Sequence, residues 1–287
     1  MLDVGYLILI GLLFYLYILR LKPYLKYIIY KFRLAGWLDI LLYRISELHN
    51  RKANQVYKQQ YPQTVLPADY AFYETYQLIY QKFIEDGELA AREITEWTNP
   101  YINSQNPCLL DWGCGAGRII RHLSALQPHT ILYGCDVNEE IIDWNKSNYP
   151  NICFTAIHGF PPMLYAPSFF NLVYGISVFT HIEAGQQVNW LIELHRILQT
   201  NGILLITTHG PYYYKKLLPV EKKILMEKGL YTQTYFKQGH RMMSTYHQPT
   251  HFKKMIEPYF TILEYYDGTV HPNKTGGQDL WILQKKS

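Results

Sequence analysis

The chain has 287 residues, of which 48 % are hydrophobic, and its formal net charge is +4 at pH 7. This composition excludes a disordered chain, and the length predicts one α/β domain of about 200 residues with additional segments. Residues 1–60 carry nine Lys or Arg against three acidic residues, so the remainder of the chain is slightly acidic. A nucleic-acid substrate is therefore not expected.

The first predicted element is an apolar helix. No residue from Val4 to Leu19 is charged, and Lys22–Arg33 mixes basic residues with Tyr, Ile and Leu. The apolar run would reach roughly 24 Å, short of a bilayer core of about 30 Å unless its flanks are included. We expect residues 1–35 to attach the chain to a membrane, either spanning it or lying on it, with the rest of the chain in the cytoplasm. A buried helix of a cap is the alternative.

Residues 36–105 show aromatic-rich helical patterns and are expected to form a helical cap. From residue 106 short apolar runs alternate with helical patterns, which is typical of parallel βαβ units in a doubly wound sheet. The expected strands cover residues 108–111, 130–135, 151–157, 171–176 and 203–208. The expected helices cover residues 118–126, 139–148 and 188–198, the last of them ended by Thr200-Asn201-Gly202.

The alternation stops after residue 208. Residues 210–248 read as an insertion rich in Tyr, Lys and Met. A helix over 250–256 and two strands over 260–266 and 280–284 follow, and the strands are joined without a helix. Such a link is typical of an antiparallel pair. The four cysteines show no metal-ligand spacing, so no metal site is expected. Unpaired cysteines in predicted strands suit a reducing compartment, which we expect for this chain.

Three glycines, Gly113, Gly115 and Gly117, lie between the first strand of this domain and its first helix. Their spacing is G-x-G-x-G, whereas a dinucleotide fingerprint requires a small residue where this chain has Arg118. Asp111, two residues before the first glycine, would repel a pyrophosphate and attract an ammonium group. Asp136 ends the second strand, where a carboxylate can accept hydrogen bonds from ribose hydroxyls. The start of the helix after the loop offers backbone N–H groups to an anion, here a carboxylate. S-adenosylmethionine combines an ammonium, a carboxylate and a ribose.

Five segments together resemble the class I S-adenosylmethionine-dependent methyltransferases: LLDWGCGAGR, YGCDVNEEI, NLVYGISVFTHI, LHRILQTNGILLITTHG and GGQDLWILQKK. The resemblance runs from about residue 80 to the end of the chain. It implies an α/β fold with a seven-stranded doubly wound sheet whose last strand is antiparallel, here with an α-helical N-terminal extension. It also implies a methyltransferase domain over 106–287, S-adenosylmethionine as cofactor and S-adenosylhomocysteine as product.

The resemblance also implies roles for individual residues. Asp111 would hold the methionine amino group, and the backbone of four loop residues would line the methionine portion: Gly113, Cys114, Gly115 and Gly117. Asp136 would bind the ribose, with Val137 and Asn138 beside the adenine. His158-Gly159-Phe160 stands where the family often has an acidic or amide side chain, so Phe160 is expected to contact the adenine. Ser177 and Val178 would flank the reactive sulfonium.

The acceptor is predicted from less specific features. His181 and His209 follow strand ends on the ligand-facing edge, where either could serve as a general base for a hydroxyl acceptor. The 210–248 insertion is expected to select the acceptor. With the expected membrane attachment, these features favour O-methylation of a small, glycan or lipid-linked molecule. A non-catalytic, membrane-associated scaffold that binds S-adenosylmethionine is the alternative, and an NAD(P)-dependent oxidoreductase is disfavoured by the loop spacing. The oligomeric state is not predicted.

Overall fold

The computed structural model describes residues 35–76, 78–233 and 243–287. The expected membrane-attachment segment, residues 1–35, lies outside them except for its last residue. Within the described residues, no helix has both the length and the apolar character needed to cross a bilayer.

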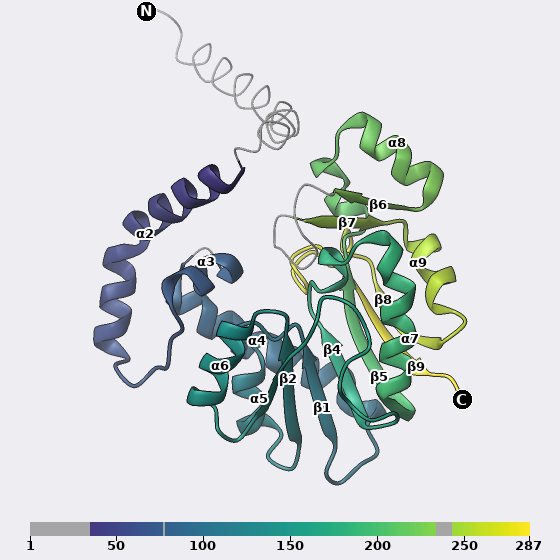
Figure 1. Cartoon of the computed structure of the whole chain (residues 1–287), viewed down its shortest axis with the longest axis horizontal. Coiled ribbons are helices and arrows are strands. Elements are labelled where there is room, and N and C mark those ends of the chain that lie inside the picture. The colour runs from purple at the N-terminus through teal and green to yellow at the C-terminus, as the bar shows by residue number, and fades with distance from the viewer. Residues whose placement is uncertain (1–34, 77, 234–242) are drawn as a thin grey trace, which may run out of the picture.

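The structure is built on a seven-stranded sheet with the order β3-β2-β1-β4-β5-β9-β8 (Figure 1). β9 is antiparallel to both of its neighbours, and the other pairs in the sheet are parallel. The predicted fold class, including the antiparallel last strand, is therefore confirmed. The strands are β1 (Cys108–Trp112), β2 (Ile131–Asp136), β3 (Cys153–Ala156), β4 (Phe170–Gly175), β5 (Leu198–Thr208), β8 (Phe260–Tyr266) and β9 (Asp279–Lys285).

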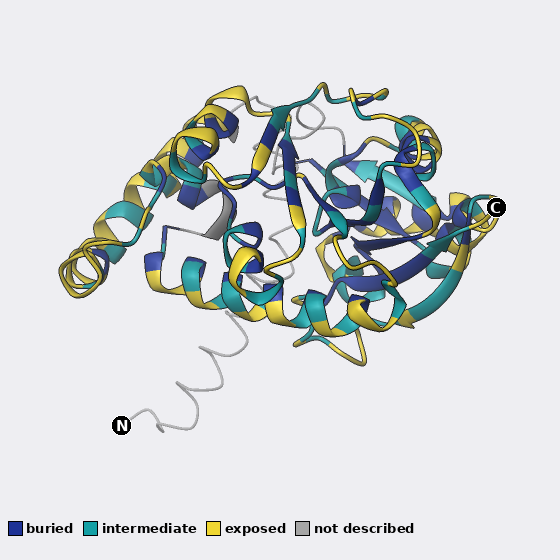
Figure 2. Cartoon of the chain, turned by 90° about the horizontal axis from the view of Figure 1, so that it is seen from below, coloured by how far each residue is buried: buried dark blue, intermediate teal, exposed yellow. Residues whose placement is uncertain are grey.

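Helices cover both faces of the sheet because the strands are apolar on both sides. Leu109 of β1 packs with α4 (Tyr80–Thr98), α5 (Ile120–Leu126) and α6 (Glu139–Asn148). Its neighbour Leu110 points to the other face, with α7 (Gln187–Ile197) and α9 (Pro249–Ile256). The same alternation divides the other central strands between two apolar cores, and Figure 2 shows these strands largely buried.

The N-terminal part of the described chain is helical. α2 (Ala35–Gln60) and α3 (Asp69–Tyr76) precede α4, and a short 3-10 helix, η1 (Asn99–Tyr101), leads toward β1. Asn54 fixes α2 to the start of α4, since its side chain donates to the Leu78 carbonyl (2.9 Å) and accepts from the Tyr80 amide (3.2 Å).

The segment after β5 forms its own small layer. It contains η4 (Pro211–Lys216), α8 (Pro219–Lys228) and a two-stranded antiparallel sheet of β6 (Leu230–Gln233) and β7 (Ser244–His247). The His247 amide donates to the His209 carbonyl (2.9 Å), which attaches β7 to the end of β5. The small layer therefore stands over the carboxyl edge of the large sheet. Between β4 and α7 lie η2 (Phe179–His181) and η3 (Ala184–Gln186).

One predicted boundary was wrong. Thr200-Asn201-Gly202 was expected to end the third helix, but α7 ends at Ile197 and β5 already begins at Leu198. Asn201 has φ = 62° inside the strand, and the pairing of β4 with β5 shifts between Phe170 and Leu172. The turn-forming residues therefore produce an irregularity in the strand rather than a loop before it.

Candidate functional site

The glycine loop is tied to the end of β2 by backbone hydrogen bonds. The amides of Gly113 and Cys114 both donate to the Cys135 carbonyl, at 2.8 and 2.9 Å. The Gly115 amide donates to a carboxylate oxygen of Asp136 (2.9 Å), whose other oxygen accepts from the Asn138 amide (3.0 Å). Burial raises the pKa of Asp136, and these amides oppose that effect. Asp136 is thus held in a fixed orientation between two strand ends.

The loop can take this path because its glycines adopt left-handed backbone conformations. Gly113, Gly115 and Gly117 have φ of 78°, 50° and 68°. At Gly113 there is a second requirement, since a methyl group on its Cα would lie 2.6 Å from Val178 Cγ2. Glycine therefore lets the loop approach the turn that follows β4.

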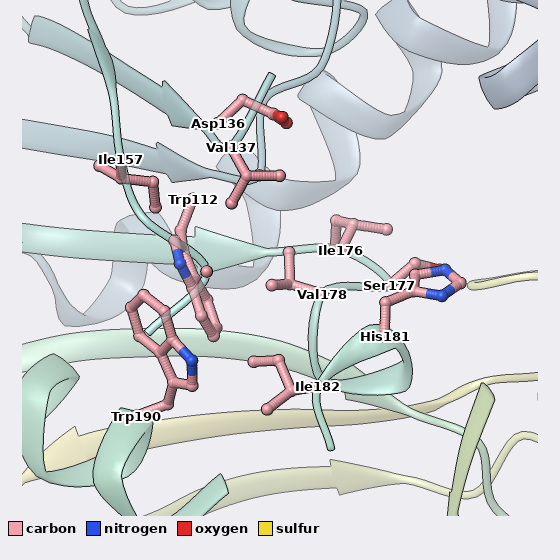
Figure 3. Close-up of a pocket in the computed structure, with 12 residues that line it drawn as sticks. Trp112, Asp136, Val137, Ile157, Ile176, Ser177, Val178, His181, Ile182 and Trp190 are labelled. Atoms are coloured by element: carbon pink, nitrogen blue, oxygen red, sulfur yellow. The ribbon is translucent and has the colours of Figure 1, made fainter. Parts of the chain in front are cut away.

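A cavity of about 170 Å³ opens beside this loop (Figure 3). Residues at the ends of β1, β2 and β4 line it together with the following turns. Six of the residues singled out in the sequence belong to this lining: Gly113, Asp136, Val137, Ser177, Val178 and His181. In Figure 3, Asp136 lies across the cavity from Ile182 and Trp190.

The remaining walls are mostly apolar and were not anticipated. They are formed by Trp112, Ile157, Gly159, Ile176, Ile182 and Trp190. Trp112 and Trp190 contact each other with ring centroids 5.0 Å apart. Trp112 ends β1 and Ile157 directly follows β3, so their positions along the sequence could have identified them as cavity residues. Trp190 is brought in by the packing of α7 and carries no such signal. Indole and isoleucine walls suit a flat, apolar ring.

Asp111 does not line the cavity but lies buried below the loop, with 4 % of its surface exposed. Burial raises its pKa to about 7, although a hydrogen bond with the Tyr174 hydroxyl and the charge of Arg118 act in the opposite direction. Among the other loop residues, Cys114 is buried, and its Sγ lies 3.6 Å from the Gly115 carbonyl. The following helix α5 has only seven residues, so its start contributes little to anion binding.

Two further residues expected beside the adenine lie outside the cavity. The Asn138 side chain caps α6 by accepting from the Ile141 amide (3.2 Å). Phe160 is 62 % exposed and stacks on His158, with centroids 5.8 Å apart. The exposed Phe160 ring therefore belongs to the outer surface near Gly159 rather than to the cavity wall.

Ser177 is held in a left-handed conformation, with φ = 63°, in the turn after β4. Its amide donates to Thr207 Oγ1 (2.8 Å), Thr207 Oγ1 donates to Gln278 Oε1 (2.6 Å), and the Gln278 amide group hydrogen-bonds Ser177 Oγ. Non-glycine residues with positive φ are uncommon, and they persist where the surroundings fix them. The terminal GGQD segment thus supplies a positioning group that the sequence reading did not assign.

The two candidate histidines have different surroundings. His181 borders the cavity, and its Nδ1 lies 2.7 Å from the Met243 carbonyl, which can only accept; Nδ1 therefore carries the hydrogen. His209 is 7 % exposed and stacks on Tyr213 at 4.1 Å, away from the cavity lining. The structure brings His181, and not His209, to the cavity.

Known methyltransferase domains are similar to this chain. Residues 109–202 match the model of a methyltransferase domain. A malonyl-[acyl-carrier protein] O-methyltransferase from Legionella pneumophila is 27 % identical over 118 residues, which cover 38 % of each chain. The match thus spans well under half the length of that curated relative.

Solved structures share the fold. An S-adenosylmethionine-dependent methyltransferase from Methanosarcina mazei aligns with a TM-score of 0.52 and 18 % identity, over 66 % of this chain and 96 % of that one. A putative methyltransferase from Haloferax volcanii, in complex with the Trm112 activator, aligns with a TM-score of 0.52 and 11 % identity, over 78 % and 100 %. The matched methyltransferase domain and the sheet order support the resemblance of residues 106–287 to the class I S-adenosylmethionine-dependent methyltransferases.

Proposed function

We propose that this chain transfers the methyl group of S-adenosylmethionine to an oxygen atom of a small or lipid-linked acceptor. The observation that carries the proposal is the Asp136 carboxylate, which borders the cavity and is fixed by the Gly115 amide. A fixed carboxylate at the end of β2 suits the two hydroxyls of a ribose. Each of its oxygens accepts one hydrogen bond from a backbone amide and has a second lone pair for a hydroxyl.

The cavity fits the remaining parts of the cofactor. The apolar walls near Val137 and Ile157 suit the adenine. Ser177 and Val178 border the same cavity, which supports their proposed place beside the sulfonium. Asp111 is close enough to the loop to attract the methionine ammonium through the backbone layer or a water. The backbone of the loop is proposed to line the methionine portion at Gly113, Cys114, Gly115 and Gly117.

When bound, S-adenosylmethionine supplies an electrophilic methyl group on a positively charged sulfur. The chain's own residues then orient the two reactants and exclude water. His181 is the proposed general base, because its Nδ1 hydrogen is directed to Met243 and its Nε2 is consequently the proton-accepting nitrogen. A hydroxyl acceptor needs such a base, whereas a carboxylate acceptor does not. The Legionella relative, an O-methyltransferase by name, supports oxygen as the acceptor atom.

The domain organisation is proposed on the same basis. Residues 106–287 carry the transfer, the 210–248 insertion contributes to acceptor selection, and residues 1–35 attach the chain to a membrane. The insertion supports its role by position, since Met243 contacts His181 at the border of the cavity.

Calorimetric titration with S-adenosylhomocysteine tests the cofactor site. Asp136→Asn is expected to weaken its affinity at least tenfold, about 1.4 kcal/mol, because a hydrogen-bonded carboxylate is lost from the ribose site. Asp143→Asn, which alters an exposed carboxylate on α6, is the matched control and should bind as the wild type does. Binding of NADH with similar affinity, or equal affinity of the Asp136 variant, would contradict the proposal.

A methyl-transfer assay distinguishes an active enzyme from a non-catalytic scaffold that only binds S-adenosylmethionine. The full chain is incubated with methyl-tritiated S-adenosylmethionine and, in parallel, lipid vesicles or the small-molecule extract of the expression host. Label in a product, reduced at least tenfold by His181→Gln with the affinity for S-adenosylhomocysteine retained, supports base-assisted O-methylation. Release of the label by mild alkali would identify a methyl ester instead and remove the need for His181. Binding without transfer to either fraction would favour the scaffold.

A further inference from the structure

Helix α2 extends from the body of the molecule (Figure 1), and many of its residues are exposed (Figure 2). Exposed apolar side chains occur along its length. Four of them are Trp37, Leu41, Ile45 and Leu48, with exposed fractions of 78 %, 56 %, 52 % and 70 %. Their spacing of four, four and three residues places them on one face of the helix. We call this face the α2 apolar stripe.

The opposite face of α2, which packs against the protein, combines polar side chains with the aromatic rings of Tyr43 and Tyr57. Buried Asp39 accepts hydrogen bonds from the hydroxyls of Tyr70 (3.2 Å) and Tyr73 (3.3 Å). Asn54, nearly two turns before the C-terminal end of α2, forms the hydrogen bonds with Leu78 and Tyr80 described above. A surface helix normally turns its apolar face inward. Here the α2 apolar stripe faces outward, so the body of the molecule does not require it for packing, which leaves it available to another partner.

The charges beside the stripe favour an anionic partner. Arg44, Arg51, Lys52 and Lys58 are all exposed on α2. Glu47 balances Arg44, with which it pairs at 2.8 Å, and Asp39 is buried. No acidic residue of this helix is therefore left at the surface to balance Arg51, Lys52 and Lys58. Apolar residues that include a tryptophan, flanked by Lys and Arg, are typical of helices that lie in the interface of an anionic bilayer.

The preceding sequence points to the same partner. The uncharged run from Val4 to Leu19 and the basic segment Lys22–Arg33 lead directly into α2. A membrane bound by residues 1–35 would hold the start of α2 at its surface. A protein partner for the stripe would have to compete with that surface for the same exposed side chains.

We propose that the α2 apolar stripe lies in the headgroup region of an anionic membrane, with its basic flank on the lipid phosphates. This extends the proposed membrane attachment from residues 1–35 into a helix that the sequence assigned to the cap. It also gives the carboxyl edge of the sheet a fixed position relative to the lipid surface, because Asn54 ties α2 to α4.

A fluorescent label on the stripe tests this placement in the full chain. Cys153, the exposed cysteine, is replaced by serine, and an environment-sensitive nitrobenzoxadiazole group is attached at Leu48→Cys. Vesicles with about 30 % phosphatidylserine should shift its emission to shorter wavelength, and nitroxide lipids should quench it. The same label at Leu164→Cys, where the native side chain is 89 % exposed between β3 and β4, should keep its aqueous emission.

Three results would overturn the proposal. If the label at position 48 keeps its aqueous emission in vesicle-bound protein, residues 1–35 attach the chain to the membrane without the α2 apolar stripe. A blue-shifted signal without vesicles would show that the stripe is covered by the same chain or, where the shift depends on protein concentration, by a second copy. An equal shift with purely zwitterionic vesicles would remove the role of the basic flank. None of these readouts depends on methyl transfer, so they are independent of the proposed activity.

Discussion

At the residue scale, Asp111 has a proposed binding role, but its buried negative charge destabilises the folded protein. Its raised pKa of about 7 means that the folded protein binds a proton there which the unfolded chain releases above about pH 4. The stabilising effect of that proton is complete below about pH 4 and is lost as the pH rises through about 7. A bound ammonium group would restore favourable charge pairing at neutral pH.

Asp111→Asn is therefore expected to stabilise the free protein at about pH 8, by roughly 2–4 kcal/mol, because a buried charge is removed. The gain should shrink toward zero at about pH 4. The same change should weaken S-adenosylhomocysteine binding, since the ligand's ammonium loses its counter-ion. Urea unfolding at both pH values and calorimetry measure the two effects. A variant that is less stable than the wild type at about pH 8 would contradict the assignment.

Gly113 and Gly115 offer a matched pair of substitutions. Gly115→Ala should cost only the left-handed conformation, about 1–2 kcal/mol, because its Cβ would meet nothing within 4 Å. Gly113→Ala should cost more, about 2–4 kcal/mol, since the contact with Val178 is added. Val178→Ala in the Gly113→Ala background should recover the steric part alone. Equal unfolding free energies for the two single variants would show that the loop can move away from Val178.

At the element scale, His247 joins β7 to α7. Its Nε2 lies 2.7 Å from Gln187 Oε1, and the Gln187 amide nitrogen donates to two carbonyls, so Nε2 of His247 carries the hydrogen. Its Nδ1 is buried with no hydrogen-bond partner among the described residues. Burial lowers the pKa of His247 to about 3, so protonation opposes the folded state.

The sign of this effect is opposite to that of Asp111. The stability that neutral His247 provides is complete above about pH 6.5 and is lost as the pH falls toward 3. His247→Gln should reduce the loss of unfolding free energy between about pH 7.5 and pH 5 by about 2 kcal/mol. His129→Gln, at an exposed position, is the control. An unchanged pH dependence in the His247 variant would mean that this histidine is protonated without loss of the β7–α7 contact.

The elements that could be predicted are those with a strong local signal. The strand–helix alternation after residue 106 predicted the strands of the large sheet along the chain, and the helix expected over residues 139–148 is α6. The start of β5 was missed because Asn201-Gly202 looks like a turn and is accommodated inside a strand. β6 and β7 were missed because each has only four residues, which is too short for a clear strand pattern in the sequence.

At the scale of the whole molecule, only some of the residues that line the cavity could be predicted from the sequence. Asp136, Gly113 and Ser177 follow strand ends, and parallel topology brings such residues to one edge. Trp190 and Ile182 reach the cavity through the packing of α7 and η2, which depends on tertiary contacts. The Ser177–Thr207–Gln278 network joins residues about a hundred positions apart. The outward orientation of the α2 apolar stripe was likewise hidden, because a periodic pattern alone does not say which face meets the protein.

The position of β9 also has a consequence for synthesis. Asp279–Lys285 pairs with β5 on one side and β8 on the other, yet it emerges from the ribosome after both. Until then, Ile203–Thr208 of β5, whose side chains are mostly apolar, forms an open edge with unpaired backbone groups beside four strands that can already pair. Open apolar edges are sites of mispairing between chains. The nascent domain therefore completes its sheet when β9 inserts between β5 and β8. It is most prone to aggregation just before that step.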